Sequence, residues 1–145
     1  MKSISQIEPL IREGERKAME EYLNSGGWLT EHTKTKEFEK IIADYVGSKY
    51  CVVTTSGTVA LTLAVMALKI IDEIIVPDFT MIASANAVRL AKAKPFLVDI
   101  DPKNLCIDIE NLNFTPAQKH FHRAMIFVSL NGRCPEMEKV IELCK

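Results

Sequence analysis

Apolar residues recur at helical spacing along the first third of the chain. A helix is predicted from about residue 35 to the glycine at position 47, because its apolar residues fall on one helical face. They are Phe38, Ile41, Ile42, Tyr45 and Val46. An earlier helix is predicted to begin near Pro9 and to end at the Asn-Ser-Gly-Gly run of residues 24–27, since such residues commonly break helices.

Beyond residue 49 the pattern changes to short β-branched runs that alternate with helical segments. Strands are predicted at residues 50–53, 73–76, 95–100 and 124–130, and helices at 58–68, 80–90 and 135–144. The helix at 58–68 is apolar nearly all round, as expected of a helix buried against a sheet. This alternation favours an α/β fold with a mostly parallel sheet flanked by helices.

Composition agrees with one folded unit. The 145 residues are 48% hydrophobic with a formal net charge of -1, which is ordinary for a soluble protein. We expect an N-terminal helix and loop over residues 1–34, followed by the α/β part over 35–145. The 18 lysines and arginines are balanced by 19 acids, so the basic surface of a nucleic-acid-binding protein is not expected.

Neither a membrane span nor a metal site is expected. No apolar run reaches the ~18 residues that a membrane helix needs, and the first ten residues lack a signal-peptide layout, which predicts a cytoplasmic protein. The cysteines are widely spaced, with no Cys-x-x-Cys pair, so we expect them to be reduced and free of metal. They are Cys51, Cys106, Cys134 and Cys144.

The segment around Ser56, Gly57 and Thr58 joins a predicted strand to the start of the buried helix. Free main-chain amides and the positive end of the helix dipole point out of such a turn, and two hydroxyls add donors. A glycine lets a ligand approach the backbone closely. The turn is therefore a candidate phosphate site. The alternative is that Ser56 or Thr58 merely caps the helix.

A second turn follows the predicted strand at 73–76 and reads Pro77, Asp78, Phe79, Thr80, Met81. In open α/β sheets ligands bind outside the carboxyl ends of the strands, so this turn is expected to face the same crevice as the first. Either Phe79 or Met81 can then cover a planar ring. The alternative has Phe79 in the core and Thr80 as a helix cap.

Three further polar residues follow predicted strands. Asp101 begins a good turn sequence and is expected to be structural. Asp99 either binds a ligand or holds a neighbouring backbone amide, and the second interpretation is favoured. Arg133 either clamps an anionic substrate group or lies solvated at the surface.

Taken in order, several segments resemble the DegT/DnrJ/EryC1/StrS family of aminotransferases, which depend on pyridoxal 5'-phosphate (PLP) and make amino sugars on nucleotide carriers. The resemblance covers most of the chain, and five motifs occur in the family's order and spacing. They are Gly-Trp-Leu-Thr at 27–30 leading to Glu-Phe-Glu at 37–39, Thr-Ser-Gly-Thr-Val-Ala-Leu at 55–61, Val-Pro-Asp-Phe-Thr at 76–80 with the alanines that follow, Lys-Pro at 94–95 with Val-Asp-Ile-Asp at 98–101, and Asn-Gly-Arg at 131–133.

The resemblance implies the N-terminal part of the large domain of an aspartate-aminotransferase-like PLP fold. Ser56, Gly57 and Thr58 then hold the cofactor phosphate. The place where relatives usually carry an aromatic that stacks on the cofactor ring is Met81, a softer contact. On the substrate side, the family's motifs fall on Thr30, Phe79 and Arg133.

The resemblance also implies groups that match no position in this chain. The family's lysine that forms the Schiff base with PLP, and the aspartate that pairs with the pyridine nitrogen, lie beyond the last matched motif. We therefore expect no catalytic residue here and no activity of the chain alone. The implied partners are a nucleotide-linked keto-sugar and an amino-acid donor, with a homodimer as the full-length state.

Two hypotheses from different classes follow. The first is an N-terminal fragment of a sugar aminotransferase, and the second is a non-catalytic phosphate-binding or assembly module of the same fold. A plain α/β nucleotide binder is a third and weaker option. On the fragment hypothesis the sheet has uncovered edges and faces, so the isolated chain is expected to self-associate or to be marginally stable.

Overall fold

The computed structural model describes residues 4–5, 7–30, 33–112, 122–135 and 137–144. The chain forms two compact units, Met1–Val53 and Thr54–Lys145. Each unit is described by itself. The predicted domain division after residue 34 stays a prediction.

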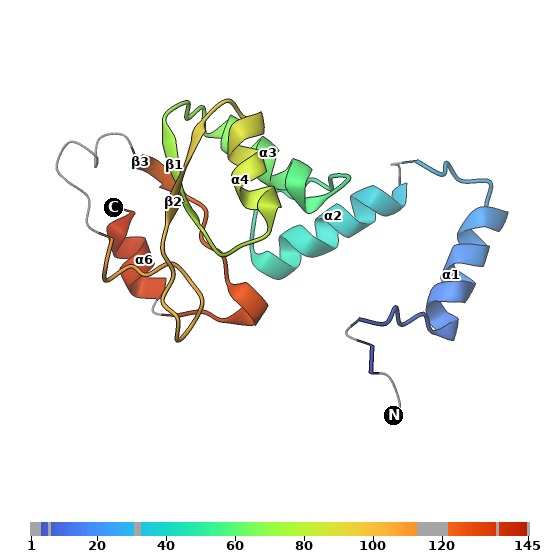
Figure 1. Cartoon of the computed structure of the whole chain (residues 1–145). Helices are drawn as coiled ribbons and strands as arrows, with labels where there is room; N and C mark the ends of the chain where they lie inside the picture. Colours follow the sequence, from blue (N-terminus) through green and yellow to red (C-terminus); the bar gives the residue numbers. More distant parts are fainter. Residues whose placement is uncertain (1–3, 6, 31–32, 113–121, 136, 145) are drawn as a thin grey trace. The chain divides into compact units, whose positions relative to one another are not determined.

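The first unit contains two helices, α1 (Glu13–Asn24) and α2 (Thr33–Val46) (Figure 1). α1 ends where the Asn-Ser-Gly-Gly run predicts, with Gly26 in the left-handed region at φ 69°. α2 ends before Gly47, whose φ is 72°. Glycine is suited to both positions because a Cβ disfavours that region. Both predicted helix ends are confirmed.

The second unit is an α/β layer structure. Its elements are α3 (Gly57–Ala67), β1 (Glu73–Pro77), α4 (Ile82–Leu90), β2 (Lys94–Val98), β3 (His122–Met125), the 3-10 helix η1 (Leu130–Gly132) and α6 (Met137–Leu143). The three strands form a parallel sheet in the order β2-β1-β3. In its register Ile75 of β1 lies beside Phe96 of β2 and Met125 of β3. The expected α/β class with a parallel sheet flanked by helices is confirmed.

The central strand β1 is buried on both faces, which explains its unbroken apolar run. Ile74 and Val76 pack in a cluster with Val65 of α3 and Val88 of α4. Ile75 points to the opposite face and packs with a second cluster, formed by Val98, Ile107 and their neighbours. Fully burying a side chain of this kind contributes about 1.5–3 kcal/mol, so β1 anchors the second unit.

One predicted strand is wrong. Residues 50–53 form no strand and join no ladder among the described residues, and β1 already has a strand on each side. Tyr50 and Val52 are 75% and 74% exposed. The Val53 amide donates instead to Glu39 Oε1 of α2 at 2.9 Å. A β-branched run becomes a strand only when another strand offers its hydrogen-bonding groups, which local sequence does not reveal.

Other element boundaries also differ from the predicted ones. β3 begins earlier and ends sooner than the predicted strand at 124–130, whose last residue, Leu130, opens η1. β2 ends at Val98, and Ile100 forms only an isolated bridge with Ile107. The helix predicted to begin near Pro9 begins at Glu13, and the helix predicted from Thr80 begins at Ile82. The predicted helices at 58–68 and 135–144 are present as α3 and α6.

Candidate functional site

Ser56 is the N-cap of α3. Its backbone is extended, at φ -164° and ψ 161°, and its Oγ accepts a hydrogen bond from the Val59 amide at 3.3 Å. The Ser56 carbonyl accepts from the Ala60 amide at 3.0 Å and from the Thr54 hydroxyl at 2.9 Å. The capping interpretation of Ser56 is thus correct. It does not exclude an anion, because a hydroxyl that accepts a bond still has its own hydrogen to donate.

The first turn of α3 leaves donors open. Within the described part of the chain, the amides of Gly57 and Thr58 have no hydrogen-bond acceptor, as expected at a helix start. Ser56 and Gly57 are exposed and Thr58 is half-buried. A Cβ built on Gly57 would meet nothing within 4 Å, so there is open space beside these amides. The turn is therefore shaped and charged to receive an anion.

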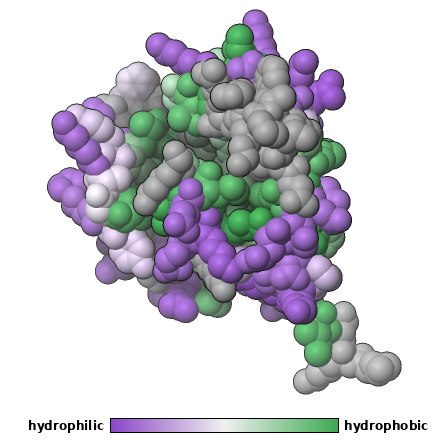
Figure 2. Space-filling view, turned by 90° about the vertical axis from the view of Figure 1, so that its left-hand side faces the viewer, coloured by the Kyte–Doolittle hydropathy of each residue, from purple (hydrophilic) through white to green (hydrophobic). Residues whose placement is uncertain are grey.

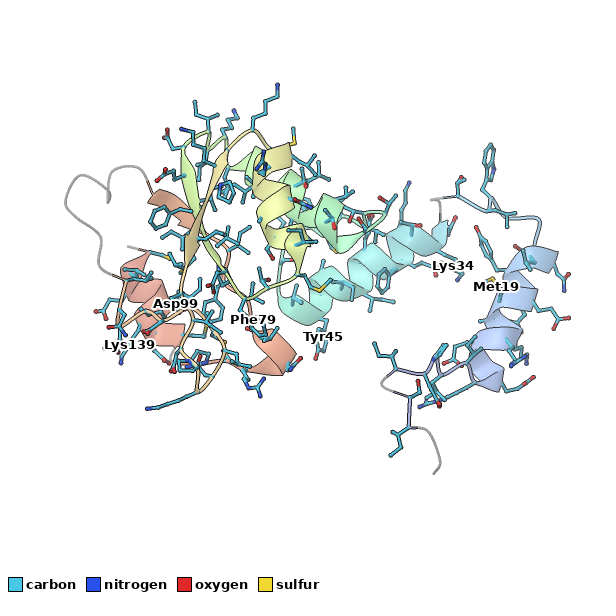
Figure 3. All side chains as sticks on the ribbon, viewed as in Figure 1. Met19, Lys34, Tyr45, Phe79, Asp99 and Lys139 are labelled. Carbon is cyan, nitrogen blue, oxygen red and sulfur yellow. The ribbon has the colours of Figure 1, made fainter. Side chains whose placement is uncertain are left out.

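The turn between β1 and α4 presents two large apolar side chains. Met81 is 74% exposed and Phe79 is 52% exposed, so the alternative with Phe79 in the core is wrong. Figure 3 shows Phe79 in the loop that follows β1. The Asp78 amide donates to the Val98 carbonyl at 2.9 Å, which ties the turn to the carboxyl end of β2.

The N-terminus of α4 contains a feature that the sequence analysis missed. Met81 is the N-cap and makes no side-chain cap hydrogen bond, and Thr80 is not the cap as one interpretation had it. The Thr80 and Ser84 hydroxyls instead lie 3.0 Å apart, and Ser84 is only 4% exposed. The sequence does contain a signal for this pair: two hydroxyl residues stand four positions apart, and the residue after the first of them, Met81, cannot cap a helix through its side chain.

The two acids after β2 are structural. Asp99 Oδ1 accepts from the Ile100 amide at 3.0 Å (Asp99 is labelled in Figure 3). Asp101 accepts from the Lys103 amide at 2.8 Å and from the Asn104 side-chain amide at 3.0 Å. Both arrangements confirm the interpretations that the sequence favoured.

The remaining predicted site residues lie at surfaces. Arg133 is exposed directly after η1, and its amide donates to the Leu130 carbonyl at 3.1 Å. Asn131, just before it, has φ 52°, so the chain turns sharply there. Thr30 is exposed in the first unit. The predicted phosphate residues, the two ring-covering candidates and Arg133 all belong to the second unit.

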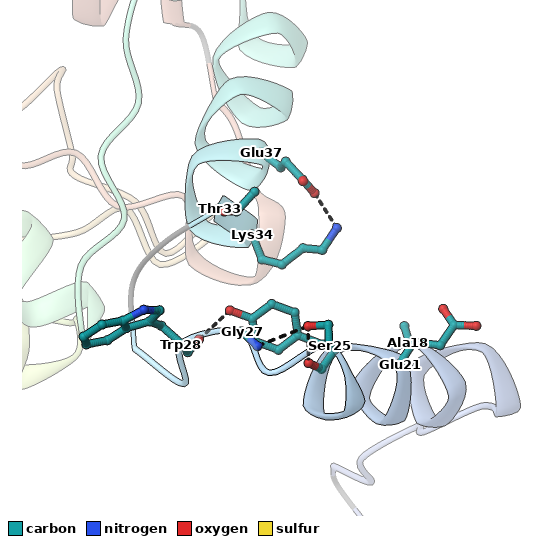
Figure 4. Close-up of a pocket in the computed structure, with 9 residues that line it drawn as sticks. Ala18, Glu21, Ser25, Gly27, Trp28, Thr33, Lys34 and Glu37 are labelled. Atoms are coloured by element: carbon teal, nitrogen blue, oxygen red, sulfur yellow. Dashed lines mark hydrogen bonds and ion pairs between the residues drawn. The ribbon is translucent and has the colours of Figure 1, made fainter.

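A cavity of about 590 Å³ lies within the first unit, between α1 and the start of α2 (Figure 4). Trp28 and Tyr22 line it, together with Lys34 and Glu37, whose Nζ and Oε2 are 2.7 Å apart. The hydrogen bond with Glu37 raises the pKa of the Lys34 ammonium, so that group stays charged at neutral pH. The charged residues that line the cavity are two acids, Glu21 and Glu37, and one base, Lys34. The lining is therefore not positively charged, as an anion site would be.

A smaller cavity of about 380 Å³ in the second unit has an acidic lining that includes Asp108 and Glu110. Lys139 of α6 pairs with Glu110 at 2.5 Å. Across the described ranges, no group of three or more His, Cys, Asp or Glu is arranged to hold a metal ion. No helix in those ranges has the length and apolar character needed to cross a membrane.

Comparison with known families gives a match over almost the whole chain. The model of the DegT/DnrJ/EryC1/StrS aminotransferase family matches residues 9–145, which confirms the resemblance found in the sequence motifs. One relative, a UDP-2-acetamido-2-deoxy-3-oxo-D-glucuronate aminotransferase of Pseudomonas aeruginosa, is 43% identical over 72% of this chain and 29% of its own length. A GDP-perosamine synthase of Escherichia coli O157:H7 is 33% identical over 100% of this chain and 40% of its own length.

Solved structures agree. The putative sugar aminotransferase Spr1654 from Streptococcus pneumoniae, in its PMP form, aligns with a TM-score of 0.81 at 29% identity, over 93% of this chain and 34% of that one. PseC from Helicobacter pylori, an aminotransferase involved in the biosynthesis of pseudoaminic acid, aligns with a TM-score of 0.84 at 27% identity, over 99% of this chain and 38% of that one. Spr1654 is also known in a PLP form, which agrees with the cofactor expected from the motifs. The chain thus spans between 29% and 40% of the length of these relatives.

Proposed function

Since this chain belongs to the DegT/DnrJ/EryC1/StrS aminotransferase family, we propose that it is the N-terminal portion of a PLP-dependent sugar aminotransferase. Its part in that enzyme is to bind the cofactor phosphate. The observation that carries the proposal is the first turn of α3, where the Gly57 and Thr58 amides are open and the space beside Gly57 is empty.

The residues of this turn fit a phosphate group. The two amides and the hydroxyls of Ser56 and Thr58 offer four donors at the positive end of the α3 dipole. The dipole alone contributes about 0.3–1 kcal/mol per charge at an exposed helix end, so the several donors acting together supply most of the affinity. When bound, PLP supplies an electron sink for the carbanion that amino-group transfer requires.

On this proposal, the ring of PLP lies against the turn between β1 and α4. Met81 is exposed there and takes the place of the family's stacking aromatic. A thioether gains about 0.3–1.5 kcal/mol from an aromatic face but is held less rigidly than a ring. Phe79, half exposed in the same turn, is proposed to lie on the substrate side.

The proposed substrates are a nucleotide-linked keto-sugar and an amino-acid donor. The names of the relatives from P. aeruginosa and E. coli support this class, since one name contains a UDP-linked sugar and the other a GDP-linked sugar. Arg133 and Thr30, both exposed, are the proposed substrate-side residues. A cytoplasmic location and a homodimeric full-length enzyme complete the proposal.

We further propose that the chain does not transaminate alone. The resemblance implies that the family's Schiff-base lysine, and the aspartate that pairs with the pyridine nitrogen, match no position in it. Lys69, Lys92 and Lys94 flank turns and strands and carry no matching motif. Without an attached lysine, bound PLP is expected to remain exchangeable.

Titration with PLP tests the proposal. We expect saturable, reversible binding of PLP that inorganic phosphate displaces, with much weaker binding of pyridoxal, which lacks the phosphate. Borohydride reduction followed by mass spectrometry should give no stoichiometric pyridoxyl-lysine on this chain. The same treatment of a full-length relative is the positive control.

Three outcomes contradict the proposal. Equal affinities for pyridoxal and PLP would mean that the turn at Ser56, Gly57 and Thr58 does not bind the cofactor phosphate. Preferential binding of a nucleotide over PLP at Ser56 would favour a nucleotide-binding module instead. A single stoichiometric pyridoxyl-lysine would disprove the proposed lack of an attachment site.

A further inference from the structure

The start of α4 departs from the usual capping rule at one position. N-cap residues are normally Ser, Thr, Asp or Asn, whose side chain accepts a first-turn amide, and replacing such a cap by Ala costs about 0.5–2 kcal/mol. Met81 occupies the N-cap of α4 and provides no such bond. Departures of this kind concentrate where a residue serves function rather than stability.

Ser84 compensates for this departure from inside the protein. Its hydroxyl lies 3.0 Å from the Thr80 hydroxyl, on the residue before the cap. Its amide donates to the Met81 carbonyl at 3.0 Å. Ser84 therefore contacts both Thr80 and Met81, the last two residues before α4. At 4% exposure it is also shielded from water, which favours a fixed hydroxyl pair.

The other end of the turn is fixed as well. The Asp78 amide is bonded to the Val98 carbonyl at 2.9 Å, so the turn is held at β2 before it and at α4 after it. Between these points the Met81 side chain is 74% exposed. Hydrogen bonds thus hold the backbone before and after Met81, while its side chain is mostly exposed and makes no cap hydrogen bond.

We propose that Ser84 is a positioning residue for the cofactor: its part-buried hydroxyl pair with Thr80, together with its amide's bond to the Met81 carbonyl, holds the backbone that presents Met81 to the ring of PLP. The inference rests on the proposed function, because it assumes that PLP lies at this end of the sheet. Ser84 itself does not touch the cofactor. It acts through Thr80 and Met81.

A double-mutant cycle separates positioning from general support of the fold. PLP affinity is measured by titration, following the cofactor's induced circular dichroism, for the unaltered chain, Ser84→Ala, Met81→Ala and the double variant. In the presence of Met81, Ser84→Ala should weaken binding about 5- to 10-fold, the size expected for losing one buried hydrogen bond. In the Met81→Ala chain the same change should alter affinity less than about 2-fold.

Two variants of Thr80, the half-buried partner of Ser84, test the same hydrogen bond from its other end. Thr80→Val removes the hydroxyl but keeps the shape, and should reproduce the loss of affinity and of the induced signal. Thr80→Ser keeps the hydroxyl and should restore both. This pair keeps the test valid if Ser84→Ala fails to fold, which a far-ultraviolet melt reveals.

The outcomes distinguish a failure of the positioning role of Ser84 from a failure of PLP binding itself. An equal loss from Ser84→Ala with and without Met81, or equal binding by Thr80→Val and Thr80→Ser, would overturn the positioning role while leaving PLP binding intact. A folded, unaltered chain that shows no PLP binding would overturn the proposed function and this inference together.

Discussion

On the proposed function, Ser56 combines two tasks in one side chain. Its Oγ accepts the Val59 amide and caps α3, and its hydrogen remains available to a ligand. The two tasks place different demands on the residue. To cap a helix, a side chain must accept a hydrogen bond from a first-turn amide. To bind a phosphate, it must donate a hydrogen bond and must not carry a negative charge. Substitutions at Ser56 can therefore separate stability from anion binding.

Two variants of Ser56 should behave in opposite ways. Ser56→Asp keeps an N-cap acceptor, so the melting temperature should change little, but its carboxylate should abolish measurable PLP binding by repulsion. Ser56→Ala should lower the free energy of unfolding by about 0.5–2 kcal/mol and weaken PLP binding only in part. Thermal melts and PLP titrations check both. Tight PLP binding by Ser56→Asp would place the phosphate elsewhere.

Restoring the family's usual aromatic at Met81 should strengthen the contact with the cofactor ring. Because aromatic pairs gain about 0.5–1.5 kcal/mol and a thioether contact about 0.3–1.5 kcal/mol, Met81→Phe should tighten PLP binding by no more than severalfold. Met81→Ala should weaken it. The comparison is made by titration at fixed salt. Identical affinities in all three chains would mean that residue 81 lies outside the site.

At the residue scale, the sequence correctly predicted the features that depend on residues close by in the chain. Ser56 at a helix start and Asp101 in its turn follow from residues one to four positions away, and the structure has both bonds. The burial of Ser84 was missed, because it depends on how α4 packs rather than on the local pattern. Whether Phe79 was buried or exposed also depended on packing beyond its own turn.

At the scale of helices and strands, periodic segments were predicted well. α2, α3 and α6 appear within a few residues of their predicted positions, because one apolar face or a wholly apolar run defines such helices. The predicted strand at 50–53 failed for a different reason. A strand is stabilised by its neighbours, and its apolar residues alone do not show whether one is available.

The first turn of α3 can be tested with its glycine. Gly57 does not have positive φ and a Cβ there meets nothing, so Gly57→Ala should leave the fold intact and stabilise it by roughly 0.4–1 kcal/mol. The new methyl group would stand in the space beside the open amides, so PLP binding should weaken at least severalfold. Thermal melts and titrations measure the two effects. An unchanged PLP affinity would show that no ligand approaches the backbone at Gly57.

At the scale of the whole molecule, much apolar surface is uncovered. Val59, Leu63 and Met66 of α3 are between 39% and 55% exposed. Figure 2 shows apolar patches among the hydrophilic ones on the face it presents. The outer edges of β2 and β3 pair with no strand in the described part of the chain. Exposed apolar faces and open sheet edges both promote association.

The isolated chain should therefore self-associate. Light scattering over a range of concentrations should show an average mass that rises with concentration. Leu63→Glu, at a half-exposed position of α3, should reduce this rise without lowering the melting temperature by more than a few degrees. Lys36→Gln, at an exposed position of α2, changes the net charge by the same one unit and is the matched charge control. A monomer at every concentration, with a sharp cooperative melt, would contradict the expectation.

The bond between Thr80 and Ser84 also bears on how such a site can diversify. Because residue 81 contributes only its backbone carbonyl to the start of α4, no side-chain cap bond restricts which side chain stands there. Another bulky side chain can therefore replace Met81 without the loss of a cap hydrogen bond.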